Sequence, residues 1–166
     1  MNVKIRLTDN AWFVFLKNKG YKEVNFWSPS GRNTNFENGE LVLFKKHKNS
    51  KDEDADGLIV GGGFVKDFYI KPTEEVWNTL GDKNGCATKD DFYEIINEYR
   101  KRTGNLDNND VGCLILENVF YLQEGIDAEK EIPHFTWSKS IVRGKTIKEE
   151  DVKEALLKAI KINLAR

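Results

Sequence analysis

The sequence predicts a single α+β domain, in which a mixed, partly closed β-barrel is flanked by helices. Runs with strand-like patterns fall into two groups, one before residue 71 and one from residue 111 onward, and amphipathic helical patterns lie between and after them. The chain has 166 residues, of which 39% are hydrophobic and 32% charged, as in a soluble globular protein with one core. We therefore expect residues 1–166 to form one domain.

The first elements are a strand and a helix. Residues Val3 to Leu7 alternate as a strand does, Thr8 offers its hydroxyl as the N-cap of a helix, and Gly20 ends that helix. The inward face of the helix carries Trp12, Phe13 and Leu16.

Three further strands are expected at residues 23–27, 40–47 and 57–70, each bounded by turn residues. Their patterns are those of neighbours in one sheet. The third contains the run "GGGF", Gly61 to Phe64, without the G-x-G-x-x-G frame or the following helix of a phosphate loop. Glycines inside a strand more often mark a bulge, or a place where a backbone or a ligand comes close.

Two helices follow the third strand. Pro72 and Thr73 open a short one, and Thr88, with Asp91 three residues later, caps a longer amphipathic one after the loop "GDKNGCA". The inward residues are expected to be Val76, Trp77 and Leu80 on the first helix and Phe92, Ile95, Ile96 and Tyr99 on the second.

The last third contains a long strand and a terminal helix. The strand covers residues 111–123 and is bent near Glu117 and Asn118, and residues 133–136 are extended. Thr146, with Glu149 three residues later, begins a C-terminal helix over residues 146–166. Its inward face carries Val152, Leu156, Ala159 and Ile160.

Several classes of protein are excluded by what the chain lacks. Its apolar runs are too short to cross a membrane, and its first residues lack the apolar region of a secretory signal, so we expect a cytoplasmic protein without a membrane partner. Cys86 and Cys113 are isolated, which is typical of free, partly buried thiols in a reducing compartment. Together with His47 and His134 they lack the spacing of a zinc site, so neither a metal nor a cofactor is expected.

Recognisable catalytic motifs are also missing. The sequence contains no G-x-S-x-G, Walker-type phosphate loop or H-E-x-x-H, so no catalytic residue is assigned. A hydrolase whose residues meet only in space remains a third hypothesis, because such arrangements leave no trace in sequence.

Charge is nearly balanced over the chain but uneven along it. The net charge of −1 argues against binding nucleic acid by bulk electrostatics. Residues 45–51 and 137–145 are nevertheless basic, and residues 52–56 between them in sequence are acidic. These are either solvated loops or, beside exposed aromatic residues, a local site for anions.

Two tryptophans lie at similar places in the pattern. Trp27 and Trp137 each stand where an extended run ends, followed by serine and basic residues. Each is either a packed indole or one side of a clamp for a planar group. If Trp27 and the strand of Phe44 lie beside the glycine-bared strand, that strand would form the floor of a concave site.

Six segments carry a family resemblance. In order they are "EVNFWSPSG", "LVLFKKH", "IVGGGF", "GDKNGCA", "VGCLILENVFYL" and "WSKSIVRGKT", between Thr8 and Thr146. Together they resemble the SRA-like module ahead of the nuclease domain in McrA-type HNH restriction endonucleases. The resemblance implies a PUA/SRA-like barrel that binds double-stranded modified DNA and flips 5-methylcytosine or a related base into a pocket.

The resemblance also implies a site. Trp27 would stack on the base, Asn25 and either Ser30 or the backbone N–H groups of the turn would read its edge, and Trp137 would close the other side. The pocket would be formed by Asn25, Trp27, Ser30, Phe44, His47, Gly62, Gly63, Phe64, Trp137 and Ser138. The phosphates would be held by Arg32, Lys45, Lys46, Lys48, Lys139, Arg143 and Lys145.

No HNH motif follows, so cleavage is expected only from a fused or separate HNH nuclease, for which the C-terminal helix is a possible lead-in. The alternative hypothesis is a PUA-like module for RNA or a small planar ligand, because related barrels bind both.

Overall fold

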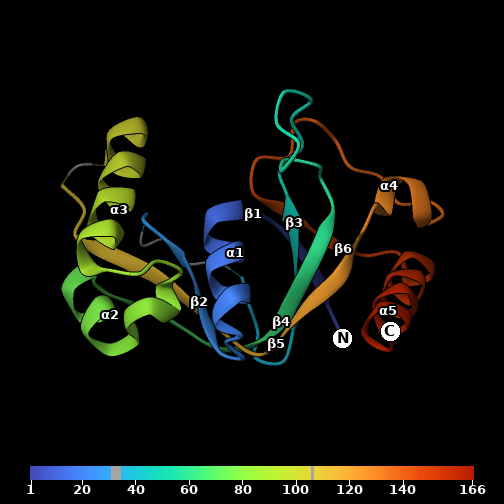
Figure 1. Cartoon of the computed structure of the whole chain (residues 1–166), viewed down its shortest axis with the longest axis horizontal. Helices are drawn as coiled ribbons and strands as arrows, with labels where there is room; N and C mark the ends of the chain where they lie inside the picture. The colour runs from blue at the N-terminus through green and yellow to red at the C-terminus, as the bar shows by residue number, and fades with distance from the viewer. Residues whose placement is uncertain (31–34, 106) are drawn as a thin grey trace. The chain divides into compact units, whose positions relative to one another are not determined.

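Most of the strands and helices lie where the sequence predicts them. The computed structural model describes residues 1–30, 35–105 and 107–166. Its elements are β1 (Val3–Thr8), α1 (Asn10–Lys19), β2 (Val24–Ser28), β3 (Leu41–Lys46), β4 (Ile59–Pro72), α2 (Thr73–Leu80), the 3₁₀ helix η1 (Gly81–Asn84), α3 (Lys89–Thr103), β5 (Asp110–Ile126), α4 (Ala128–Glu131), β6 (Gly144–Ile147) and α5 (Glu150–Leu164) (Figure 1).

The six strands form one mixed sheet in the order β2-β5-β4-β3-β1-β6. β1 pairs in parallel with β3 and antiparallel with β6, while β2 pairs antiparallel with β5 and β3 with β4. Closing a barrel requires the two outermost strands to pair, and within the described residues β2 and β6 each have one neighbour. The predicted α+β class with a mixed sheet and helices is confirmed, but the sheet is not closed into a barrel.

The expected neighbours of β2 differ from the observed ones. β3 and β4 are adjacent, with Leu43 opposite Gly62, as predicted. β2 instead pairs with β5, which places Trp27 opposite Cys113. The prediction that β2 lies beside β3 or β4 is therefore wrong, because alternation identifies a strand and its faces but not its partner.

The chain divides into two compact units. Unit 1 comprises residues 1–10, 39–64 and 119–166, and unit 2 comprises residues 11–38 and 65–118. The long strands β4 and β5 contribute residues to both. The single domain expected from chain length stays a prediction.

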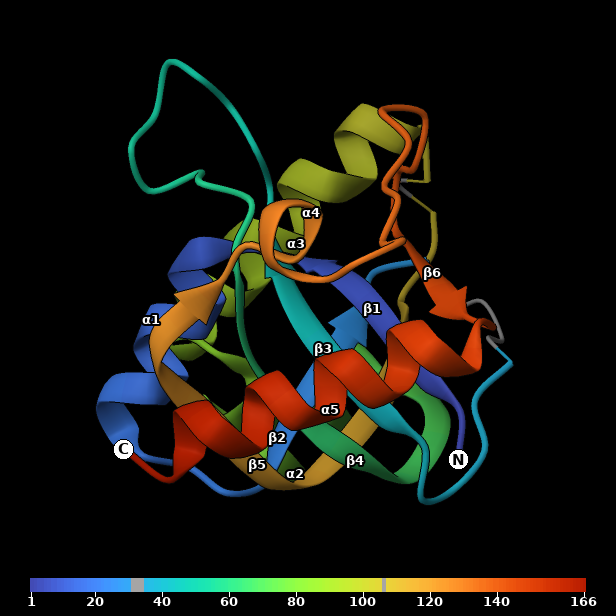
Figure 2. The same cartoon turned by 90° about the vertical axis from the view of Figure 1, so that its right-hand side faces the viewer.

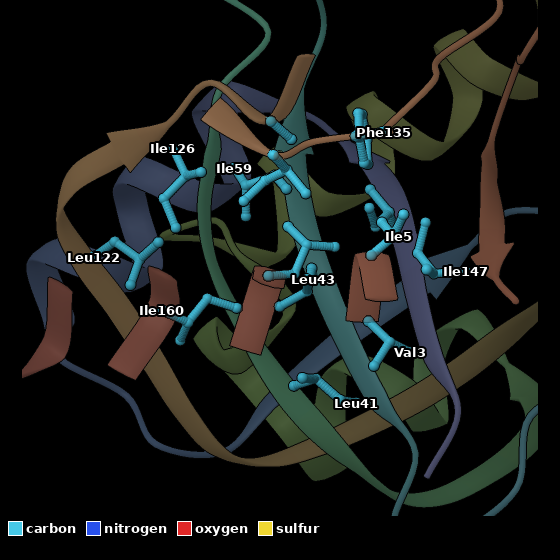
Figure 3. Close-up of a cluster of buried hydrophobic side chains, with 14 residues drawn as sticks. Val3, Ile5, Leu41, Leu43, Ile59, Leu122, Ile126, Phe135, Ile147 and Ile160 are labelled. Carbon is cyan, nitrogen blue, oxygen red and sulfur yellow. The ribbon is translucent and has the colours of Figure 1, made fainter. Parts of the chain in front are cut away.

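The core of unit 1 lies between α5 and its strands. Val152, Leu156 and Ile160 follow one another at four-residue spacing on α5 and are buried against β1 and β3, where Val3 and Leu43 are fully buried (Figure 2). Figure 3 shows Phe135 at one end of this cluster and Leu41 at the other. The inward face predicted for the C-terminal helix is confirmed for these three residues, and Ala159 is partly buried beside them.

The core of unit 2 is formed by α2, α3 and the first half of β5. Val76, Phe92 and Ile96 are buried against Val111 and Cys113. Trp77 and Leu80, predicted to face inward, are partly buried against the same cluster. Ile95 and Tyr99 were also predicted inward but are 38% and 37% exposed, because the buried stripe of α3 is narrower than its apolar pattern.

Three local predictions have different outcomes. The bend in the long strand is confirmed, since Asn118 has a φ of 50°. Thr8 does not cap α1, because its hydroxyl donates to the carbonyl of Arg6. Thr146 does not begin α5 either, because it lies in β6 opposite Lys4.

The region before α5 also departs from expectation. α4 is not indicated by the sequence pattern, and the segment predicted to be extended from Pro133 begins as a turn in which His134 has a φ of 66°. Within the described part of the chain, no helix combines the length and the apolar character that crossing a bilayer requires.

Candidate ligand-binding site

The residues predicted to form one pocket are distributed over both units. Asn25, Trp27 and Ser30 belong to unit 2. Unit 1 contains Phe44, His47, Gly62, Gly63, Phe64, Trp137 and Ser138. Arg32, predicted to bind phosphate, lies outside the described residues.

Asn25 is an interior residue of unit 2. Its side chain is fully buried and donates to Asn84 Oδ1 at 2.8 Å, and its carbonyl accepts from the indole N–H of Trp12 at 3.2 Å. Asn84 in turn donates to the carbonyl of Gly81 at 2.8 Å. These bonds fasten β2 to η1, so the expected role of Asn25 in reading a base edge does not fit its burial.

Trp27 is engaged in the same network. Its indole N–H donates to the carbonyl of Asn84 at 2.8 Å, and its ring packs edge-to-face on Phe92 and Tyr99 at centroid distances of 5.3 and 6.3 Å. The ring is half-buried against the core of unit 2. These contacts favour a structural role for Trp27.

Ser30, the third of these residues, lies in the turn after β2. Its hydroxyl is 2.9 Å from that of Ser28, and its carbonyl accepts from the amide of Asn108 at 2.8 Å. The turn is therefore tied to the loop before β5.

Gly62, in the glycine run of β4, is covered within unit 1. A Cβ on Gly62 would lie 2.6 Å from the carbonyl oxygen of Val42 and 2.9 Å from the ring of Phe120. Phe44 on the neighbouring strand is fully buried. At Gly62 the strand therefore accommodates an aromatic ring of the protein itself, which does not favour a ligand at that position.

A different group of residues gathers at one end of the unit 1 core. We call it the basic–aromatic cluster and define it as Lys45, Phe135, Trp137 and Lys145. Phe135 and Trp137 stand two residues apart in the segment between α4 and β6, and their rings are nearly parallel, with an interplanar angle of 7° and centroids 6.3 Å apart. Phe135 is buried and Trp137 half-buried, so part of the indole remains accessible.

Lys45 reaches the cluster from β3. It lies on the same face of the strand as Leu41 and Leu43, and only 2% of its surface is exposed. Its ammonium lies 4.7 Å from the centre of the Trp137 ring, a cation–π contact. Burial lowers the pKa of Lys45, and the positive charge of Lys48 lowers it further. The negative charges of Glu129, Asp127 and Asp56 act in the opposite direction.

Lys145 reaches the cluster from β6, where it lies opposite Ile5. Its ammonium donates to the backbone carbonyl of Thr136 and lies 3.4 Å from the hydroxyl of the same residue. The same nitrogen lies 5.2 Å from the Phe135 ring centre and 6.0 Å from that of Trp137. Both lysines therefore contact the aromatic segment from the sheet.

Three further cations stand near the cluster in sequence: Lys48 is three residues after Lys45, Lys139 two residues after Trp137, and Arg143 two residues before Lys145. Lys48, Lys139 and Arg143 are exposed, and within the described residues none of them forms an ion pair. Lys46, by contrast, pairs with Asp56 at 3.6 Å. The connection between β3 and β4 and the segment before β6 leave the same end of the unit 1 strands (Figure 1, Figure 2).

The remaining predicted residues of unit 1 have simple surroundings. His47 is exposed at the start of the connection after β3, and Phe64 is partly buried against the unit 1 core. The hydroxyl of Ser138 is 2.8 Å from that of Ser140 in a turn beside Trp137. The sequence analysis therefore identified Trp137 and both lysines but not Phe135 and Thr136. The pattern that could have identified them is two aromatic residues at i and i+2 on either side of a polar residue.

Acid–base chemistry has little support elsewhere. Within residues 1–30, 35–105 and 107–166, no three His, Cys, Asp or Glu side chains gather as metal ligands. His134 Nδ1 lies 2.8 Å from Asp151 Oδ2, a bond that lowers the pKa of Asp151, but both groups are exposed. Burial raises the pKa of the Cys86 and Cys113 thiols to about 11, so neither is a ready nucleophile. The basic–aromatic cluster is suited to bind a ligand that has both a planar group and an anionic group.

Comparison with known proteins gives a fold. No protein-family model matches the sequence, and no curated protein matches it. The fold is similar to the crystal structure of ASCH from Zymomonas mobilis, with a TM-score of 0.61 at 12% identity, covering 94% of each chain. A tyrosine-to-phenylalanine variant of that protein matches with a TM-score of 0.61 at 9% identity, over 95% of this chain and 98% of that one. A serine-to-alanine variant gives 0.62 at 9% identity, over 95% and 94%.

These similarities concern the fold alone. ASCH domains are PUA-like, so the chain has a PUA-like fold, as the resemblance in sequence implied. An SRA module or an association with McrA-type nucleases finds no support in them.

Proposed function

We propose that the chain is a PUA-like binding module for single-stranded RNA, in which a base stacks on Trp137 and neighbouring cations hold the phosphates. One observation carries the proposal: a parallel aromatic pair contacts the ammonium groups of Lys45 and Lys145, and three exposed cations, Lys48, Lys139 and Arg143, stand within three residues of this cluster in sequence. Within the described residues, none of these five cations has a carboxylate ion pair. Base stacking and phosphate binding are the two interactions that single strands offer without sequence readout.

Single strands suit this geometry better than a duplex. An accessible indole can stack only on a base that is not already stacked in a helix. The net charge of −1 supplies no bulk attraction to a polyanion, so binding depends on the local cations. PUA-like domains are generally binding domains, which is consistent with a module of this kind.

Recognition of modified duplex DNA is the less favoured function. It would require Trp27 to stack on a flipped base and Asn25 to read its edge. Both residues are engaged by Asn84 inside unit 2. A small planar ligand would use the same indole as RNA and differs in not needing the exposed cations.

Fluorescence anisotropy with labelled oligonucleotides tests the proposal. The probes are a single-stranded RNA of about ten nucleotides, within the ~4–16 nucleotide range of such sites, and duplexes carrying cytosine, 5-methylcytosine or 5-hydroxymethylcytosine. We expect the RNA to bind most tightly. Trp137→Leu, which keeps apolar bulk but removes the stacking face, should weaken RNA binding by about one to two orders of magnitude.

Trp77→Leu is the matched control, because Trp77 is also half-buried but belongs to the core of unit 2. It should leave RNA affinity at the parent level, with thermal unfolding measured to show that both variants are folded. Tighter binding of a modified duplex than of RNA would replace the proposal with modified-DNA recognition. Free nucleotides binding as tightly as the oligonucleotide would replace it with a small planar ligand.

A further inference from the structure

We infer that the cations of the site have two different roles. Lys45 and Lys145 are positioning residues that hold the aromatic pair, whereas the phosphate contacts belong to Lys48, Lys139 and Arg143. This inference rests on the proposed function and assigns a role to each cation of the site. It departs from the sequence-based prediction, in which all five cations bind phosphate alike.

Lys45 is too enclosed to serve as a phosphate ligand. With 2% of its surface exposed, it offers almost no area to a ligand outside the protein. Its ammonium lies over the Trp137 ring at 4.7 Å, and within the described residues it has no ion pair. A buried cation that has lost most of its water gains more from an aromatic face than an exposed one does. The contact therefore holds the indole against the end of β3.

Lys145 is engaged by the segment that carries the aromatic pair. Thr136 stands between Phe135 and Trp137, and its carbonyl and hydroxyl both lie within hydrogen-bonding distance of the Lys145 ammonium. An ammonium has three N–H donors, so at most one remains for a ligand. Fixing the middle residue of a three-residue segment also fixes the direction of the side chains on either side. Lys145 thus sets the orientation of both rings.

The three remaining cations have the opposite character. Lys48, Lys139 and Arg143 are exposed, and within the described residues no carboxylate pairs with them. Burial lowers the pKa of the Arg6 guanidinium, and the nearby positive charge of Arg143 lowers it further. An exposed cation without an ion pair is stabilised when a polyanion arrives.

The salt dependence of RNA affinity separates the two classes. Methionine keeps the apolar stem of lysine and removes its charge. Lys139→Met should flatten the slope of log affinity against log salt by about 0.7, the value for one phosphate contact on a single strand. Lys145→Met and Lys45→Met should leave the slope unchanged and weaken binding at every salt concentration, by about tenfold if much of the stacking contact is lost. Lys101→Met, an exposed lysine on α3, is the control and should change neither quantity.

A second measurement needs no ligand. Acrylamide quenching of Trp137, obtained by subtracting the signal of a Trp137→Phe partner for each variant, reports how freely the indole is reached by a neutral quencher. Lys145→Met should increase this quenching above that of the parent protein. Lys145→Arg should give quenching at the parent level, and so should Lys139→Met. Thermal unfolding of each variant shows that the fold is intact.

The outcomes are distinct. If Lys145→Met flattens the salt slope as Lys139→Met does and leaves Trp137 quenching unchanged, Lys145 is a phosphate contact and the inference is overturned. If the parent fails to bind RNA, the proposed function is wrong, and the quenching of Trp137 still decides whether Lys145 positions the ring.

Discussion

Two tryptophans with the same surroundings in sequence have different surroundings in the structure. Trp27 and Trp137 each end an extended run and precede serine. The indole N–H of Trp27 finds a backbone acceptor on Asn84, and its ring finds two aromatic neighbours in unit 2. Trp137 stacks beside Phe135 and faces two ammonium groups. A residue's role as core or platform is thus set by partners distant in sequence, which the local pattern cannot supply.

Replacing Trp27 by alanine tests its structural role. The change removes the bond to Asn84 and leaves a cavity beside Phe92, so the free energy of unfolding should fall by about 3 kcal/mol, the lower end of the range for buried tryptophans. Trp27→Phe should cost less, because it keeps most of the packing. Chemical denaturation measures both. A folded Trp27→Ala protein with unchanged stability and weakened ligand binding would restore the stacking role.

At the scale of elements, three threonines show when local sequence is enough to predict the start of a helix and when it is not. Thr8, Thr88 and Thr146 were all predicted to begin helices, and only Thr88 does. Its hydroxyl accepts from the backbone N–H of Asp91 at 3.1 Å, as the local pattern predicts. The other two lie in strands, Thr8 in β1 opposite Lys46 of β3 and Thr146 in β6 opposite Lys4 of β1, and this long-range pairing outweighs the local preference for a cap.

Thr88→Ala should therefore destabilise α3. Loss of the capping acceptor leaves the N–H of Asp91 without its protein partner and should lower the free energy of unfolding by about 1 kcal/mol. Thr79→Ala is the matched control, because Thr79 is exposed on α2 and should change stability by less than about 0.5 kcal/mol. Urea denaturation distinguishes the two. Equal effects would show that the cap contributes nothing in this context.

For the whole molecule, the sequence predicted the elements and their inner faces better than the site. The α+β class, most strands and the buried stripe of α5 follow from residue patterns. The basic–aromatic cluster does not, because Lys45 and Lys145 come together only through β1, which pairs with both of their strands. The resemblance predicted the PUA-like fold, but the proposed pocket depended on β2 lying beside β3 or β4, and β2 pairs with β5.

Stability should decline at alkaline pH because two thiols are buried. Burial raises the pKa of Cys86 and Cys113 from 9.0 to about 11, so above pH 9 the unfolded chain releases protons that the folded chain keeps. Each thiol should then lower the free energy of unfolding by up to about 1.4 kcal/mol per pH unit until the folded thiol ionises near pH 11. Denaturation at several pH values should give a shallower decline for Cys113→Ala than for the parent. Parallel declines would show that the buried thiol ionises as readily as a free one.

The way the chain crosses between its units has a consequence for synthesis on the ribosome. Unit 2 contains no residue beyond Asn118, whereas unit 1 requires residues up to α5, whose Ile160 completes its core. Because a chain emerges from its N-terminus onward, every residue of unit 2 is available while β1, β3 and the start of β4 still lack the helix that covers them. Those three strands would present an uncovered apolar face during that interval. The order of emergence therefore makes the unit that carries the basic–aromatic cluster the last to be completed.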